Sequence, residues 1–430
     1  MTMISRALSA PVGAGAAERC YVYVQRPDTG QWVTVGRYRL EAGSVSGAFL
    51  YAPSYIEAGF TWSIDPVNLP LQPERDLPAT RYGGLHDVLR DACPDAWGQA
   101  LLRRAHGLPE NTSVLRYLML AGNADRWGAL AVGRQRVASV AHLASPPLPK
   151  LASLVRELEA MADGRPPLDA GLRRRLVQTA SVGGARPKAT VRDAEGELWL
   201  AKPRLRTDPT DIPCLEHVAQ CWGRDSGLDF AETILHPAAA GASVVRVRRF
   251  DRQAGRRLMC VSAASLLQAE YPGGTMTDAR WSYPRLAEEL RRIGSPPEDW
   301  RELFGRMVFN AVCGNDDDHV RNHAVVYRHE ERRWRLSPAF DVVPNPVEMP
   351  TRLAMQLSAG RRDISREAVL TDAPRFGFSN TAEAARYLDD LLMRIEAARE
   401  DACSPLGAEW RRFLYERTTA SLIKLRVAGD

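Results

Sequence analysis

The sequence carries its strongest signal in nine residues, Gly314-Asn315-Asp316-Asp317-Asp318-His319-Val320-Arg321-Asn322. Asp317 and Asn322 stand five residues apart. A phosphotransferase needs a carboxylate that takes the proton of the acceptor hydroxyl and an amide oxygen that helps to hold Mg²⁺. Kinase catalytic loops place the two side chains at this spacing. The stretch therefore indicates a catalytic loop in which Asp317 is the base.

A second acidic segment follows at a distance that a short hairpin can bridge. It reads Pro338-Ala339-Phe340-Asp341, and Asp341 stands nineteen residues after Asn322. Residues 324–327 and 334–336 are strand-like, so a hairpin between them would return Asp341 to the neighbourhood of Asn322. Mg²⁺ takes oxygen ligands, usually one or two carboxylates plus substrate phosphates. We therefore expect Asn322 and Asp341 to hold the metal.

Two other interpretations of the nine residues stay open. Consecutive aspartates often form a solvated acidic turn with no chemical role. His319 and His323 could also hold zinc together with an aspartate, although the stretch supplies neither cysteines nor an evident fourth ligand. The position of Asp341 after a predicted hairpin favours catalysis over both.

A glycine-rich loop lies upstream, at Ser181-Val182-Gly183-Gly184-Ala185-Arg186-Pro187-Lys188. Paired glycines let backbone N–H groups approach phosphate oxygens, and Arg186 and Lys188 could add positive charge. The loop lacks the Gly-Lys-Ser/Thr ending of a Walker A motif and precedes a strand rather than a helix. It is a candidate phosphate-binding loop, and a plain Gly-Gly turn is the alternative.

Lys202 ends the next predicted strand, where a lysine can reach the α- and β-phosphates of a nucleotide. Such a lysine needs a carboxylate to hold it, and Glu216 on the following predicted helix is the candidate. Residues 244–250 predict a strand that leads to a hinge whose backbone would face adenine. The alternatives are a surface lysine, a solvated glutamate and, for Arg248-Arg249-Phe250-Asp251-Arg252, a nucleic-acid patch or a charged strand end.

The order of predicted elements favours an α+β, two-lobed kinase-like fold with an N-terminal β-rich module. Residues 20–60 alternate like strands, residues 85–105 and 113–121 have helical periodicity, and the Pro-rich residues 146–149 suggest a linker. We expect an N-terminal module at 20–145, a small nucleotide lobe at 146–260 and a helical large lobe at 261–430.

Composition agrees with a globular protein of several cores. The chain has 430 residues, 45% of them hydrophobic and 25% charged, and a net charge of +5 that allows but does not require an acidic partner. Its seven cysteines show no CxxC spacing, which fits a reducing compartment. No apolar run reaches the length of a membrane span, so we expect a cytoplasmic protein.

The chain resembles the HipA toxins, serine/threonine protein kinases of bacterial toxin–antitoxin pairs. The resemblance runs from about Tyr21 to near the C-terminus. Its specific parts are the glycine-rich loop, Arg249-Phe250-Asp251-Arg252, the nine residues that end at Asn322, and Ser337-Pro338-Ala339-Phe340-Asp341. Gly47-Ala48-Phe49-Leu50-Tyr51 and Asp95-Ala96-Trp97-Gly98 look like the family's amino-terminal module.

The resemblance implies an ATP- and Mg²⁺-dependent protein kinase with Asp317 as catalytic base and Asn322 and Asp341 on the metal. Ser181 matches the family's autophosphorylated serine, whose modification expels the loop and silences the kinase. The residues implied to contact the nucleotide are Gly183, Gly184, Ala185, Arg186, Pro187, Lys188, Lys202, Glu216, Arg248, Arg249, Phe250, His319, Asn322, Phe340 and Asp341.

The resemblance also implies partners: a helix-turn-helix antitoxin of the HipB type, operator DNA held mainly through that antitoxin, and a protein substrate such as an aminoacyl-tRNA synthetase. The chain departs from the family pattern after the hinge, at Val261-Ser262-Ala263-Ala264-Ser265, and at Arg248, which puts ribose contacts in doubt. Two other functions stay open: a small-molecule phosphotransferase, and an inactive kinase fold that acts in antitoxin and operator binding.

Overall fold

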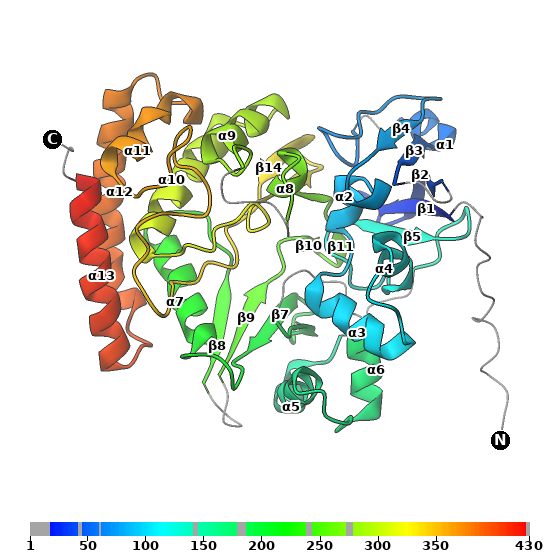
Figure 1. Ribbon diagram of the computed structural model, residues 1–430, viewed down its shortest axis with the longest axis horizontal. Helices are drawn as coiled ribbons and strands as arrows, with labels where there is room; N and C mark the ends of the chain where they lie inside the picture. Colours follow the sequence, from blue (N-terminus) through cyan, green and yellow to red (C-terminus); the bar gives the residue numbers. More distant parts are fainter. Residues whose placement is uncertain are drawn as a thin grey trace.

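The computed structural model describes residues 18–41, 45–59, 62–140, 145–178, 186–237, 243–271 and 278–426. Figure 1 shows an N-terminal β-rich module at one end, a small sheet in the middle and a bundle of helices at the other end. The prediction of an α+β, two-lobed fold with an N-terminal β-rich module is confirmed.

The N-terminal module is built on an antiparallel five-stranded sheet with the order β4-β3-β2-β1-β5. The period-2 burial that the sequence predicts is interrupted in β1, where Val22, Tyr23 and Val24 are all buried and the register with β2 shifts between Val22 and Tyr23. The tight turn between β1 and β2 uses Gly30 at a φ of +73°. The strands are β1 (Glu18–Gln25), β2 (Trp32–Leu40), β3 (Gly47–Tyr51), β4 (Leu77–Ala79) and β5 (Leu130–Gly133). The helices are α1 (Pro53–Glu57), η1 (Tyr82–Gly84), α2 (Asp87–Asp91), α3 (Ala96–His106) and α4 (Val114–Leu120).

The single helix expected over residues 85–105 is wrong, because the structure has two helices there, α2 and α3. Pro94 lies between them and has no N–H group for a continuous helical hydrogen-bond ladder. Asp95 then accepts a hydrogen bond from the Gly98 N–H group (3.0 Å) and caps the second helix. The break ends α2 at Asp91, whose carboxylate contacts Arg321 of the large lobe.

The small lobe is an antiparallel four-stranded sheet with the order β6-β7-β9-β8. Its strands are β6 (Ala189–Arg192), β7 (Leu198–Pro203), β8 (Thr233–His236) and β9 (Val244–Arg248). Helix α7 (Ile212–Asp225) begins where the Asp211 carboxylate caps the Cys214 N–H group (3.0 Å). The segments η2 (Leu148–Lys150), α5 (Leu151–Ala162) and α6 (Ala170–Gln178) complete the lobe, and Leu154 and Leu158 share a core with Val191 and Trp199.

The large lobe surrounds helix α10 (Pro297–Cys313), twelve of whose residues are buried. A three-stranded sheet, β12 (Cys260–Ser262), β13 (Ala324–Arg328) and β14 (Arg333–Leu336), stands beside it, and the β13–β14 hairpin confirms the predicted one. The short hairpin β10 (Arg252–Gln253) and β11 (Arg256–Arg257) precedes this sheet. The remaining elements are α8 (Ala263–Leu266), α9 (Tyr283–Arg292), α11 (Arg366–Thr371), η3 (Ala373–Phe376), α12 (Thr381–Ala402) and α13 (Ala408–Arg426).

One hydrophobic core runs from the N-terminal sheet into the large lobe. It joins Val22 and Phe49 of the N-terminal module with Phe304 and Phe309 of α10. Trp62 stacks on Tyr327 of β13 with ring centroids 4.6 Å apart. The N-terminal module is therefore packed against the large lobe, not tethered to it. None of the described helices has the length and apolarity to cross a membrane.

Candidate active site

The segment Gly314–Asn322 leaves the end of α10 and returns as β13. Gly314 ends the helix in the left-handed conformation (φ +77°), and its N–H group closes the last turn on the Asn310 carbonyl oxygen at 3.1 Å. The Gly314 carbonyl oxygen accepts from the Asn345 N–H group at 2.8 Å. These contacts fix the backbone at the start of the loop.

The three consecutive aspartates have three different environments. Asp318 is buried and accepts hydrogen bonds from the Tyr283 hydroxyl and the Ala354 N–H group, both at 2.7 Å. Asp316 accepts from the Asn345 side-chain amide at 3.1 and 3.2 Å. The side chain of Asp317 is 86% exposed. Of the three aspartates, Asp317 is the most exposed.

The surroundings of Asp317 favour a basic carboxylate. The protein around the cleft removes part of its hydration and, with the nearby Asp341 and Asp316 carboxylates, raises its pKa to about 6. The His319 Nε2 atom lies 3.8 Å from its Oδ1 atom. Burial lowers the pKa of His319 to about 4, so this imidazole is neutral near pH 7. Asp317 is therefore a carboxylate at neutral pH and a better proton acceptor than a fully hydrated aspartate.

The side chain of Asn322 is anchored to the backbone of its own loop. Its side-chain nitrogen donates a hydrogen bond to the Asp317 carbonyl oxygen at 2.7 Å, which assigns the amide oxygen to the opposite side. A small cavity behind the loop is lined by Asn322 together with Ala339 and Phe340, so the loop and the Asp341 segment are neighbours. An amide oxygen beside a carboxylate is a donor set that fits Mg²⁺.

Asp341 is held in a strained position by a lysine. Its φ of +59° is in the left-handed region, which is unusual for a non-glycine residue and is often found at functional sites. The Lys202 Nζ atom donates to Asp341 Oδ1 at 2.7 Å and to Glu216 Oε1 at 2.6 Å. The structure thus brings Lys202 of β7, Glu216 of α7 and Asp341 together, as the sequence analysis expects.

The charged groups of this cluster shift one another's pKa values. The Lys202 ammonium holds the pKa of Asp341 well below its usual range. Burial alone would lower the pKa of Lys202, but the Asp341 and Glu216 carboxylates outweigh it and raise that pKa. Burial lowers the pKa of Lys188, and the nearby Asp341 and Asp95 carboxylates oppose this shift. Lys202 and Lys188 therefore both lie near the Asp341 carboxylate.

Other residues of the sequence prediction face elsewhere. Arg186 makes a two-pronged ion pair with Asp208 at 2.7 and 2.6 Å. Arg248 is bound to Glu197 and Glu232 at the surface, both at 3.1 Å.

The Arg249 side chain turns to Asp125 of the N-terminal module and to Asp251. The structure therefore does not bring the side chains of Arg186, Arg248 and Arg249 to the Lys202 cluster, and the backbone of the hinge remains the candidate contact for adenine.

The aromatic rings on either side of the hinge lie together. The rings of Phe250 and Phe340 have centroids 5.1 Å apart, which joins the hinge to the Asp341 segment. Pro187 is buried at the start of β6. Ser181, Gly183, Gly184 and Ala185 lie outside the described residues.

The zinc alternative gains no support. Within the ranges that the structure describes, no group of three or more His, Cys, Asp or Glu side chains could hold a metal ion. His323 is 4% exposed and burial lowers its pKa to about 3, so it is a neutral core histidine.

One contact of the loop has no counterpart in the sequence analysis. Asp91 of the N-terminal module reaches Arg321, with 3.2 Å between Asp91 Oδ1 and Arg321 Nη1. The two residues are 230 positions apart, so no local spacing could have indicated the contact.

The two lobes, with Lys202, Glu216 and Asp341 between them, define a protein of the kinase-like fold. The HipA-like C-terminal domain family matches residues 180–399, just over half of the 430 residues, and the chain therefore belongs to the HipA family. The resemblance found from the sequence is thereby confirmed.

A solved structure of the same fold supports this assignment. The chain is similar to a chain of the Shewanella oneidensis MR-1 toxin–antitoxin complex of HipA, HipB and operator DNA, with a TM-score of 0.68 at 16% identity; the match covers 96% of this chain and 100% of that one. A weaker similarity, with a TM-score of 0.41 at 15% identity, is to the Helicobacter pylori proinflammatory kinase CtkA and covers 55% of this chain and 90% of that one. No curated protein matches the sequence.

Proposed function

We propose that the chain is a toxin-type serine/threonine protein kinase that transfers the γ-phosphate of ATP to a protein hydroxyl. The observation that carries the proposal is the buried Lys202, which donates to Glu216 at 2.6 Å and to Asp341 at 2.7 Å. A kinase-type site requires this lysine–glutamate pair and a metal-binding aspartate in place at the same time. The exposed Asp317 is near enough to Asp341 for that carboxylate to contribute to its raised pKa, which supports a place for both in one site.

The chain's own residues have separate tasks in this reaction. Asn322 and Asp341 would hold Mg²⁺, which would supply positive charge against the charge that develops on the phosphate. Lys202 would hold the α- and β-phosphates, and Glu216 would hold Lys202 in reach of them. Asp317 would orient the acceptor hydroxyl and take its proton as the oxygen attacks the γ-phosphorus; the bond from the γ-phosphorus to the bridging oxygen breaks, and ADP leaves with its electron pair.

Regulation and partners belong to the same proposal. Ser181 is the proposed autophosphorylation site, and a phosphoserine would add about −1.5 to −2 charges beside the ATP phosphates. Repulsion would then drive the glycine-rich loop outward. An antitoxin of the HipB type is the proposed neutralising partner, with operator DNA bound mainly through it. A translation factor such as an aminoacyl-tRNA synthetase is the proposed substrate, which places the protein in the cytoplasm.

The test is phosphotransfer from γ-labelled ATP in the presence of Mg²⁺, with the full-length chain and a candidate protein acceptor. We expect Asp317→Ala to lower kcat by about 10²- to 10⁴-fold while circular dichroism and ATP binding stay unchanged. Asp316→Ala is the matched control, because its carboxylate contacts Asn345. Equal turnover of wild type and Asp317→Ala would refute the assignment of the base.

Two further readouts of the same assay address acceptor and regulation. Label on a small molecule but on no protein would favour a small-molecule phosphotransferase. No label at all, with retained antitoxin binding, would favour an inactive kinase fold. Ser181→Ala should remove the label from the chain itself, and a phosphopeptide map with label elsewhere would contradict the proposed autophosphorylation site.

A further inference from the structure

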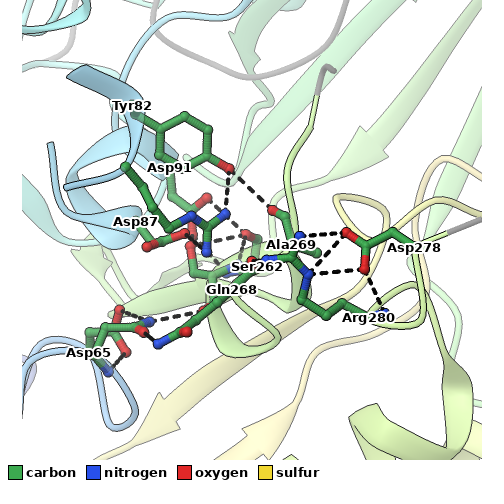
Figure 2. Close-up of polar contacts among 12 residues, drawn as sticks. Asp65, Tyr82, Asp87, Asp91, Ser262, Gln268, Ala269, Asp278 and Arg280 are labelled. Carbon is green, nitrogen blue, oxygen red and sulfur yellow. Dashed lines mark hydrogen bonds and ion pairs between the residues drawn. The ribbon is translucent and has the colours of Figure 1, made fainter. Parts of the chain in front are cut away.

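A carboxylate of the N-terminal module lies against the catalytic loop and the first turn of α8. Asp91, at the end of α2, is 4% exposed. It accepts hydrogen bonds from the Ser262 N–H group (2.8 Å), the Ser262 hydroxyl (2.8 Å) and the Ser265 hydroxyl (2.7 Å). Figure 2 shows Asp91 beside Ser262 among the polar contacts of this seam. These hydrogen bonds replace the water that the buried carboxylate has lost.

The α8 turn that Asp91 holds is itself bonded to the catalytic loop. The Ala263 N–H group donates to the His323 carbonyl oxygen at 2.8 Å, and the Ala264 N–H group donates to the Val320 carbonyl oxygen at 3.0 Å. Ser262 also pairs with Ala324, the first residue of β13. A shift of this turn would therefore move the loop backbone on both sides of Asn322.

The same carboxylate also contacts the loop directly. Arg321 Nη1 lies 3.2 Å from Asp91 Oδ1, and the Arg321 side chain is only 16% exposed. The Arg321 N–H group donates to His319 Nδ1 at 3.2 Å. Arg321 precedes Asn322, so an anchor on its guanidinium restrains the residue next to the proposed metal ligand.

We infer that Asp91 is a positioning residue of the catalytic loop, supplied by the N-terminal module. It acts through Arg321 and through Ser262, and it touches neither nucleotide nor acceptor. The inference rests on the proposed kinase function for its consequence, since the loop carries Asp317 and Asn322. A displacement of such groups by about 1 Å can cost on the order of 100-fold in rate.

The seam offers a matched control on the same helix. Asp87 lies one turn before Asp91, is 6% exposed and pairs with Arg81 at 3.3 Å. Figure 2 shows Asp87 and Asp91 in the same cluster of polar contacts. The ion pair of Asp87, however, is with Arg81, which belongs to the N-terminal module itself. Asp87→Asn therefore changes one buried carboxyl group on α2 whose ion pair does not involve the loop.

The first experiment compares Asp91→Asn, Asp87→Asn and wild type as full-length chains. We expect Asp91→Asn to lower kcat roughly 10- to 100-fold with little change in the KM for ATP, because the loop is loosened and the Lys202 cluster is not. Arg321→Gln should have a similar effect, and the double variant should be no worse than the worse single variant. Asp87→Asn should keep the wild-type kcat.

Additive losses in the double variant, or a wild-type kcat in folded Asp91→Asn, would overturn the inference. If Asp91→Asn fails to fold, Arg321→Gln tests the same anchor from the loop side.

The second experiment needs no activity. Hydrogen exchange of the peptide that covers residues 314–323 should be faster in Asp91→Asn than in wild type and unchanged in Asp87→Asn. Unchanged exchange in Asp91→Asn would reject the positioning role even if kinase activity fell. If wild type transfers no phosphate but exchange in Asp91→Asn rises, the proposed function fails and the anchor remains.

Discussion

At the scale of single residues, the site depends on a balance of charge around Lys202. Its side chain is 10% exposed, and its ammonium group lies between the Glu216 side chain, 3% exposed, and the Asp341 side chain, 41% exposed. Removal of the lysine would leave Glu216 as a buried carboxylate with an acidic neighbour. Burial already raises the pKa of Glu216 while Lys202 counteracts it, so the loss of Lys202 should raise that pKa further.

We predict that Lys202→Met abolishes phosphotransfer and destabilises the fold by about 3 kcal/mol near pH 8, since one partner of a buried pair is lost. The loss of stability should shrink as the pH falls and Glu216 takes up a proton. Urea unfolding at pH 5.5 and pH 8 measures this change. Lys202→Met/Glu216→Gln should recover stability at pH 8 but not activity. A double variant as unstable as Lys202→Met would contradict the explanation.

Lys202, Glu216 and Asp341 could be predicted from the sequence because each stands at a characteristic position next to a local pattern. Lys202 ends a strand, Glu216 lies on the next helix and Asp341 follows a hairpin. The sequence did not predict where the side chains of Arg248 and Arg249 point. The two residues are adjacent, but Arg248 faces solvent and Arg249 faces the core. The direction of a side chain at a strand end depends on what packs there, and those partners come from distant segments.

At the scale of elements, the end of α10 sets the path of the catalytic loop through Gly314. Its φ is +77°, and an added Cβ would lie 3.0 Å from the Met349 sulfur atom and 3.3 Å from Pro350 Cδ. Gly107 ends α3 with a φ of +60°, and a Cβ there would meet no atom within 4 Å. The two helix ends therefore share the backbone strain that alanine would bring and differ in the space around it.

We predict that Gly107→Ala costs about 1 kcal/mol through backbone strain alone, whereas Gly314→Ala costs about 2–3 kcal/mol through strain and crowding. Only Gly314→Ala should reduce kcat, because the shift would pass into the loop that follows. Urea unfolding and phosphotransfer kinetics of the two variants provide the comparison. Equal stability and equal kcat would show that crowding at Gly314 is relieved by the methionine.

Asp87 of helix α2 leads to a second prediction, about the pH dependence of stability. Burial raises the pKa of Asp87 to about 7, although Arg81 opposes the shift. The folded protein therefore keeps a proton between about pH 4 and pH 7 that the unfolded chain releases, so this residue lowers stability as the pH rises through that range.

Asp87→Asn has no such proton to lose. We predict that the free energy of unfolding of Asp87→Asn, relative to wild type, rises between pH 4 and pH 7 and then stays level. Urea titrations at half-unit pH steps measure it. A difference that is constant with pH, or that falls as the pH rises, would contradict the raised pKa.

Elements were predictable where the periodic signal was local and failed where tertiary contacts overrode it. The β13–β14 hairpin and α7 followed from pattern and turn residues. β5 and β8 are four-residue strands whose pairing partners lie far away or across a turn, and neither was recognised. A run of periodic apolar residues also hid the break between α2 and α3, which Pro94 imposes.

At the scale of the whole molecule, the N-terminal module and the kinase lobes form one packed body. The hydrophobic core is continuous between them, and buried charges bridge them as well. Arg249, 6% exposed, pairs with Asp125, 1% exposed, and with Asp251 at 2.8 Å. The Gly128 N–H group donates to the same Asp251 at 2.8 Å. No feature of the separate sequences of these segments predicts that they meet.

The whole chain should therefore unfold in a single transition, and a variant that breaks the bridge should destabilise all of it. We predict that Arg249→Gln lowers the free energy of unfolding by about 3 kcal/mol, since it leaves the buried Asp125 without its arginine and Asp251 with Arg252 alone. Arg248→Gln is the matched control, because its ion pairs are exposed, and should change stability by less than about 1 kcal/mol.

Calorimetry distinguishes a common fold from independent parts. In a common fold, Arg249→Gln shifts one peak that contains both the N-terminal module and the kinase lobes, and near-ultraviolet signals from both regions are lost together. Two peaks, of which only one shifts, would mean that the module folds on its own. In that case Asp91 could not act as a permanent anchor of the catalytic loop, and the contact between them would have to form and break with the docking of the module.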